Sequence, residues 1–198
     1  MRKISTVGII QYGAGNQASI INALESLGVT SLPIVTPNDV GRADKLIIPG
    51  VGHAMKAMNQ LKSSELDEAI IKTNMPLLGI CLGMQLLGIK SDEGKAKCLS
   101  VCDFETVKFN IPLKVPQMGW NKVKLRENRL FYGLPQEEWF YFVHSYYIPK
   151  SMYTIATCSY GVGFTAAVQN KNFWGVQFHP EKSGKKGLQI LKNFIELC

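Results

Sequence analysis

The sequence predicts an α/β fold in three layers, α/β/α, around a mixed, mostly parallel central sheet with an antiparallel portion in its C-terminal half. Up to about residue 88, short apolar runs alternate with helix-like stretches, which is typical of a parallel sheet covered on both faces. Beyond that point the helical pattern fades and β-type runs dominate. The last residues, 184–197, form an amphipathic helical pattern with Leu188, Leu191 and Ile195 on one side.

The N-terminal half begins with a strand over 7–10, a glycine turn and a helix over about 16–27. Gly28 follows this helix at the position where glycine commonly ends one. The other elements expected in this half are strands over 32–35, 45–48 and 77–80 and helical stretches over 53–62 and 64–73.

The C-terminal half is predicted to contain strands over 106–109, 139–143, 153–158, 164–168 and 173–178, followed by a helix over 184–197. No repeat, low-complexity segment or linker divides the chain, so we expect a single domain over 1–198. The hydrophobic fraction of 46% and the charged fraction of 19% are ordinary for a globular protein. No apolar run approaches the ~20 residues of a membrane span, and the N-terminus lacks a signal-peptide core. We therefore expect a cytoplasmic protein without a membrane partner.

Net charge and cysteine content argue against several classes of function. The net charge of +7 is compatible with nucleic-acid binding, but the lysines are spread along the chain. The aromatic run 139–142 contains no Lys or Arg, so it reads as a buried strand, and an acidic protein partner explains the charge better. Five scattered cysteines do not suggest a disulfide framework. Cys98 and Cys102 lack a zinc-site spacing and the chain has three histidines, so we expect no metal and no cofactor.

The segment Gly79-Ile80-Cys81-Leu82-Gly83 has the pattern of a nucleophile at a sharp turn between a strand and a helix. Such a turn needs small neighbours, because a bulky one would block the exposed side chain. A helix N-terminus also stabilises a thiolate. The alternative interpretation is a buried structural cysteine.

The segment His179-Pro180-Glu181 supplies an imidazole and a carboxylate two positions apart. An extended chain places both side chains on one side, and Pro180 disfavours a helical conformation at His179. The carboxylate would orient the ring and support its charge. His53 and His144 are weaker candidates for the base because neither has a carboxylate two positions away; His144 is expected to be a hydrogen-bonded structural or pocket-lining residue.

Two glycine-rich turns follow strands. The first, 12–18, fits Gly-x-Gly-x-x-Ala, but Asp39 lies beyond a proline turn, so a tight turn is favoured over dinucleotide binding. The second, Pro49-Gly50-Val51-Gly52, is either a plain turn or the source of a backbone N–H for an oxyanion site. The second donor of such a site would be Leu82, just after the nucleophile.

The motifs around Cys81 and His179 resemble those of the class I (triad) glutamine amidotransferases. The segments 115–121, 141–147 and 177–183 are similar to the glutaminase subunits of imidazole glycerol phosphate synthase. The resemblance implies hydrolysis of L-glutamine to glutamate and ammonia through a cysteine thioester. The ammonia would pass to a (β/α)₈-barrel synthase subunit, the partner in a heterodimer of histidine biosynthesis.

The resemblance also implies roles for individual residues. Cys81, His179 and Glu181 would be the catalytic triad. The oxyanion and substrate site would comprise Gly50, Val51, Gly52, Leu82, Gln85, Glu93, His144, Ser145 and Tyr146. The partner-facing side would comprise Pro116, Met118, Trp120, Asn121, Tyr141 and Lys182. The strand 50–52 would become competent only when the partner is loaded.

Two positions depart from the usual pattern of these subunits. Gln11 stands where the first strand usually ends in Asp, and Gln117 replaces the usual His before Met-Gly-Trp. One alternative is therefore a glutaminase that supplies ammonia to an amidino-sugar enzyme of surface polysaccharides. A hydrolase or peptidase with the same elbow and a non-catalytic docking subunit are the others.

Overall fold

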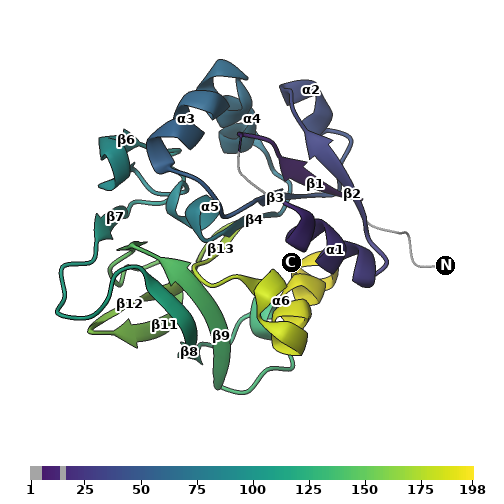
Figure 1. The fold of residues 1–198 in the computed structure, drawn as a ribbon. Coiled ribbons are helices and arrows are strands. Elements are labelled where there is room, and N and C mark those ends of the chain that lie inside the picture. The colour runs from purple at the N-terminus through teal and green to yellow at the C-terminus, as the bar shows by residue number, and fades with distance from the viewer. Residues whose placement is uncertain (1–5, 14–16) are drawn as a thin grey trace.

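The computed structural model describes residues 6–13 and 17–198, and its main feature is a nine-stranded mixed sheet (Figure 1). Its strands are β1 (Thr6–Ile10), β2 (Thr30–Ile34), β3 (Lys45–Ile48), β4 (Leu77–Ile80), β8 (Gln117–Leu125), β9 (Glu137–His144), β11 (Thr154–Tyr160), β12 (Val162–Asn170) and β13 (Phe173–Val176). Their spatial order is β2-β1-β3-β4-β13-β12-β11-β8-β9. Pairs from β2 to β13 are parallel, and pairs from β13 to β9 are antiparallel.

The parallel strands are apolar because helices cover both faces of the sheet. In β3, Leu46 and Ile48 contribute to one core cluster, whereas Ile47 contributes to the other. This alternation is the period of two that a strand imposes on its side chains. Every residue of β4 is buried, which fixes the strand that delivers Cys81.

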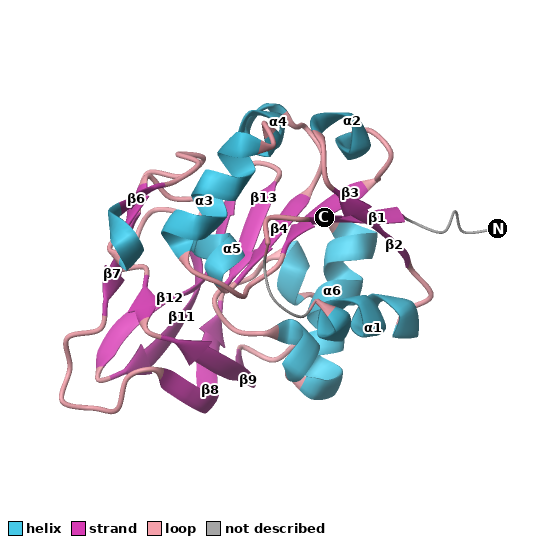
Figure 2. Cartoon of the chain, turned by 45° about the horizontal axis from the view of Figure 1, so that its top comes forward, coloured by secondary structure: helices cyan, strands magenta, loops and turns pink. Residues whose placement is uncertain are grey.

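Six helices described by the structure flank or connect the strands (Figure 2). They are α1 (Ala18–Ser26), α2 (Pro37–Val40), α3 (Ala54–Ser63), α4 (Leu66–Lys72), α5 (Leu82–Gln85) and α6 (Gly184–Leu197). Helices α1 and α6 pack in one core cluster through Leu24 and Phe194, and α3 and α4 pack in the other through Leu61 and Ile70. The two clusters lie on opposite faces of the sheet and give the three layers.

Short elements complete the C-terminal half. The strands β5 (Lys90–Ser91), β6 (Ala96–Lys97), β7 (Glu105–Lys108) and β10 (Tyr146–Tyr147) form a second sheet in the order β10-β7-β5-β6. The 3-10 turns are η1 (Glu93–Lys95), η2 (Arg129–Phe131) and η3 (Pro180–Lys182). The strand predicted over 106–109 thus belongs to this small sheet and not to the central one.

The predicted fold class is confirmed, with differences at individual elements. Strand β8 is absent from the predicted set because its alternation carries Lys and Gly on the exposed side and no continuous apolar run. The strand predicted over 173–178 ends at Val176, before the segment that turns toward η3. The predicted turn at 12–18 includes residues 14–16, which lie outside the described residues. No described helix has the length and apolarity needed to cross a membrane.

Candidate active site

Cys81 occupies a sharp turn between β4 and α5. Its backbone has φ 48° and ψ −105°, a conformation that non-glycine residues rarely adopt. Such a conformation costs about 1–3 kcal/mol and persists only where the surroundings impose it. Here the N–H of Cys81 donates to the carbonyl of Val176 at 2.7 Å, and its own carbonyl accepts from the N–H of Gln85 at 3.2 Å. These bonds hold the turn in place from β13 and from α5.

The glycines on both sides of Cys81 are required by close backbone approach. A Cβ at Gly79 would lie 2.5 Å from the carbonyl group of Gly83. A Cβ at Gly83 would lie 2.2 Å from the carbonyl oxygen of Ile48 on the neighbouring strand. The small residues that the elbow pattern predicted therefore have a steric reason in this fold.

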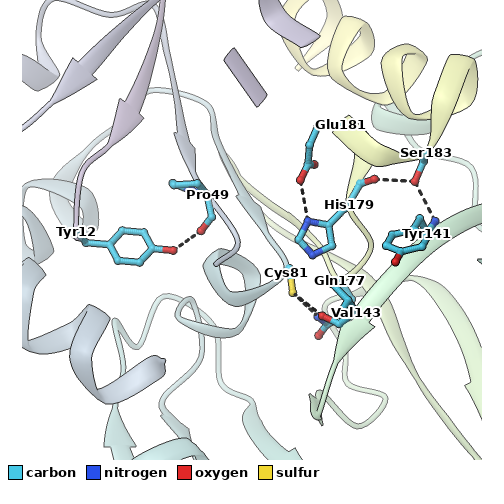
Figure 3. Close-up of polar contacts among 9 residues, drawn as sticks. All are labelled: Tyr12, Pro49, Cys81, Tyr141, Val143, Gln177, His179, Glu181 and Ser183. Atoms are coloured by element: carbon cyan, nitrogen blue, oxygen red, sulfur yellow. Dashed lines mark hydrogen bonds and ion pairs between the residues drawn. The ribbon is translucent and has the colours of Figure 1, made fainter. Parts of the chain in front are cut away.

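His179 and Glu181 form a buried pair beside this turn (Figure 3). The Nδ1 of His179 lies 2.7 Å from Oε1 of Glu181, and the two side chains are 2% and 9% exposed. His179 has an extended backbone, and Glu181 lies in η3. The N–H of His179 donates to the carbonyl of Tyr141 at 2.9 Å, and its carbonyl accepts from the hydroxyl of Ser183 at 2.7 Å. The ring is thus positioned from both its side chain and its backbone.

Electrostatic interactions favour a charged imidazole at His179. Burial opposes the charge, but the Cys81 sulfur and the Glu181 carboxylate outweigh it and raise the pKa of His179 to about 10. The Nε2 of His179 has no partner of good hydrogen-bond geometry within the described part of the chain. Figure 3 shows the ring between Glu181 and Cys81. The arrangement suits an ion pair of thiolate and imidazolium, in which Nε2 holds the mobile proton.

A network of side-chain amides surrounds the sulfur of Cys81. The Nε2 of Gln177 lies 3.4 Å from this sulfur, and the carbonyl of Val143 lies 3.7 Å from it. Gln85 donates through its Nε2 to Oε1 of Gln177 at 2.9 Å and to the carbonyl of Tyr146 at 3.0 Å. Gln177 was not among the predicted site residues.

A cavity of about 310 Å³ opens beside Cys81 and His179. Its wall contains all nine residues predicted for the oxyanion and substrate site, and it adds Val143 and Pro116, of which Pro116 was expected to face a partner. Glu181 and Lys182 instead line a neighbouring cavity of about 180 Å³, which shares Gly50, Val51 and His179 with the first. The described structure therefore brings the predicted triad and the predicted substrate residues together around one space.

Two polar residues of the cavity wall are held by backbone groups. Oε2 of Glu93 accepts from the N–H of Ala54 at the start of α3, at 2.7 Å. Nδ1 of His144 lies 2.7 Å from the carbonyl of Tyr146, which only accepts, so Nδ1 carries a proton. Burial and the nearby charge of His179 lower the pKa of His144 to about 4 despite this bond. His144 is thus neutral near pH 7, with an acceptor at Nε2.

Tyr12 is a second site residue that sequence reasoning missed. Its hydroxyl donates to the carbonyl of Pro49 and lies 3.4 Å from the carbonyl of Val51. Tyr12 is buried, and burial followed by the charge of Cys81 raises its pKa, so the hydroxyl keeps its proton. This bond fixes the direction of the peptide groups in the loop that contains Gly50.

The residues predicted to face a partner do not all share one environment. Met118 and Trp120 on β8 are 65% and 51% exposed, and Trp120 packs edge-on against Tyr141 of β9. Asn121 instead donates through Nδ2 to the carbonyl of Ser159 at 3.2 Å. The exposed apolar side chains of β8 therefore form a surface beside the cavity, whereas Asn121 braces the sheet.

Among the described residues, no group of three or more His, Cys, Asp or Glu side chains lies close enough to hold a metal ion. His53, the other weaker candidate base, precedes α3 and is exposed, outside the cavity lining. The chemistry that the site offers is nucleophilic attack by a thiolate, with proton transfer through one histidine.

Comparisons with known proteins agree with this geometry. A family model described as glutamine amidotransferase class-I matches residues 8–197. The chain is 44% identical over 195 residues to the imidazole glycerol phosphate synthase subunit HisH of Bacteroides thetaiotaomicron, covering 96% of this chain and 99% of the relative. It is 48% identical over 196 residues to the protein of the same name from Salmonella typhimurium, with coverage of 96% and 99%. A crystal structure of a glutamine amidotransferase, 16% identical, has a TM-score of 0.77 and covers 96% of this chain and 97% of that one.

Proposed function

This chain belongs to the class-I glutamine amidotransferases, and from that premise we propose that it is the glutaminase subunit of an imidazole glycerol phosphate synthase. It hydrolyses L-glutamine to glutamate and ammonia and passes the ammonia to a (β/α)₈-barrel synthase subunit in a heterodimer. The names of the relatives favour this synthase over an amidino-sugar enzyme. We further propose that residues 1–198 form one domain and that the protein acts in the cytoplasm.

The observation that carries the proposal is the convergence of Cys81, His179 and Glu181 at one cavity. The His179–Glu181 hydrogen bond of 2.7 Å and the raised pKa of His179 supply a charged, oriented ring. Cys81 and His179 line a space of about 310 Å³, which suits a small amino acid. A non-catalytic docking subunit would need none of these features.

The reaction starts when the Cys81 sulfur attacks the side-chain amide carbon of glutamine. The electron pair of the carbonyl bond moves onto its oxygen, and His179 gives its Nε2 proton to the leaving nitrogen. The carbon–nitrogen bond breaks, ammonia departs, and a thioester with Cys81 remains. His179 is neutral at that stage and takes a proton from water, whose oxygen attacks the thioester. The carbon–sulfur bond then breaks and releases glutamate and the thiolate.

The oxyanion is expected to bind two backbone N–H groups. Leu82 begins α5, and the first N–H groups of a helix have no partner within it. The second donor comes from the loop Gly50–Gly52, which reaches the cavity from the end of β3. Losing one donor of this kind typically costs about 10²–10³ in rate. The dependence of this loop on a loaded partner is part of the proposal.

The direct test mixes the chain with its synthase partner and measures the glutamate formed from glutamine. We expect Cys81→Ala to abolish glutamate formation, whereas Cys198→Ala, which removes a partly exposed thiol at the other end of the chain, retains it. External ammonium salt should restore the synthase reaction in the complex with Cys81→Ala, because only the ammonia source is lost. Glutamate formation by Cys81→Ala at the wild-type rate would refute the mechanism.

A further inference from the structure

Gln177 places an amide directly against the proposed nucleophile. The residue is fully buried just after β13. Its Nε2 lies 3.4 Å from the sulfur of Cys81, although the two residues are 96 positions apart in sequence. The triad motif that contains His179 gives this residue no role, and the mechanism above does not use it.

The hydrogen-bond network fixes which end of the Gln177 amide faces the sulfur. The Nε2 of Gln85 points at two acceptors, the carbonyl of Tyr146 and Oε1 of Gln177. Turning the Gln177 amide over would set its NH₂ group against the NH₂ group of Gln85, a contact between two donors. The oxygen of Gln177 therefore faces Gln85, and its NH₂ group faces Cys81.

A donor at this position favours the anionic form of the sulfur. Hydrogen bonds to a charged form stabilise it relative to the neutral form, and bonds to charged groups are the stronger ones. The carbonyl of Val143, 3.7 Å from the sulfur, accepts only from a thiol. The thiol and the thiolate therefore use different partners, Val143 and Gln177 respectively.

We propose that Gln177 is a further catalytic residue, whose side-chain N–H stabilises the thiolate of Cys81 and is held in this orientation by Gln85. The proposal rests on the assignment of Cys81 as the nucleophile. Gln85 lines the cavity, so the orientation of the donor is set by the same wall that receives the substrate.

The test compares Gln177→Met with the unmodified chain in alkylation of Cys81 by iodoacetamide. Methionine has a similar length but no N–H donor. We expect the pH of half-maximal alkylation rate to rise by about one pH unit, with a roughly tenfold lower rate below it. Cys81→Ala identifies the labelling that belongs to other thiols. Gln169→Met is the matched control, because Gln169 lies on β12 and its Oε1 accepts from Asn128 at 2.6 Å, in a different hydrogen-bond pair.

Equal pH profiles for Gln177→Met, Gln169→Met and the unmodified chain would overturn the proposal. Thermal unfolding checks that each variant is folded, and Gln177→Leu replaces the methionine variant if that one does not fold. A merely structural role would lower stability without moving the pH profile. Alkylation needs neither glutamine nor the synthase partner, so its outcome is independent of the glutaminase test.

Discussion

At the scale of single residues, Cys81 combines three requirements that compete with one another. Its backbone conformation is costly, its sulfur must reach the substrate, and the charge on that sulfur needs donors in a buried place. Close glycine contacts satisfy the first requirement, and the cavity satisfies the second. His179 and Gln177 together meet the third, because one supplies a positive charge and the other an N–H group.

His144 predicts a loss of stability in mild acid. Its pKa falls from the ordinary 6.5 to about 4 in the folded chain, so between these values the unfolded chain binds the additional proton. Stability therefore decreases as pH falls through this window, by about 3 kcal/mol in total. Urea unfolding at pH 7.5, 6.0 and 4.5 measures the change.

His144→Gln should remove most of this acid dependence, because glutamine keeps a donor for the carbonyl of Tyr146 but does not titrate. His53→Gln is the control, since His53 is exposed at the start of α3. If His144→Gln loses stability in acid as steeply as His53→Gln, another group is responsible.

The sequence allowed some site residues to be predicted and not others, for a physical reason. Cys81 and the His179–Glu181 pair belong to local motifs, in which neighbouring residues set the geometry. Tyr12 and Gln177 act through contacts with segments 37 and 96 positions away, and single-sequence patterns carry no signal for such contacts. Nine further cavity residues were placed by family resemblance, because the local pattern alone indicated only the oxyanion turn.

At the scale of elements, the packing of α6 on η3 positions the carboxylate of the triad. Gly187 lies in the first turns of α6, and a Cβ there would come 1.9 Å from the carbonyl oxygen of Pro180. The short turn η3 that begins at Pro180 also contains Glu181. The close approach of helix and turn therefore sets where the carboxylate meets His179.

Gly187→Ala tests this packing, because two effects of opposite sign meet there. Alanine favours a helix over glycine by about 1 kcal/mol, but overpacking costs about 1–3 kcal/mol, and a contact of 1.9 Å with backbone lies at the costly end. We expect a net loss of about 2 kcal/mol in urea unfolding and slower glutamate formation. Gly41→Ala is the control, because nothing lies within 4 Å of its Cβ and its φ is −68°. Equal stability of the two variants would contradict the packing argument.

The elements that sequence reasoning found and missed differ in their burial. Strands β3 and β4 were predicted at their observed bounds because both faces are covered and their residues are continuously apolar. Strand β8 was missed because four of its residues are exposed, among them Lys122 and Lys124. The two-residue strands β5, β6 and β10 are too short to produce a periodic pattern.

At the scale of the whole molecule, the antiparallel edge of the sheet presents apolar side chains to solvent next to the cavity. Met118 pairs with Val143 across β8 and β9, and Val143 lines the cavity. Trp120 and Trp139 continue this surface and are each 51% exposed. Exposed apolar patches beside a site are typical of protein–protein contacts. A partner seated here would cover the cavity mouth, as the transfer of ammonia without loss to water requires.

Trp120 is therefore expected to be a main contributor to binding of the synthase partner. Trp120→Ala should weaken the complex by about 2 kcal/mol, roughly thirtyfold in Kd, because large aromatic side chains at the centre of an interface dominate its affinity. Isothermal titration of the partner with each variant measures this loss, and urea unfolding of the isolated chain should change little because the indole is half exposed. Met152→Ala is the control, since Met152 is 87% exposed but lies outside β8 and β9. If both variants bind the partner as tightly as the unmodified chain, the docking surface lies elsewhere and the exposed indole has no role in transferring ammonia.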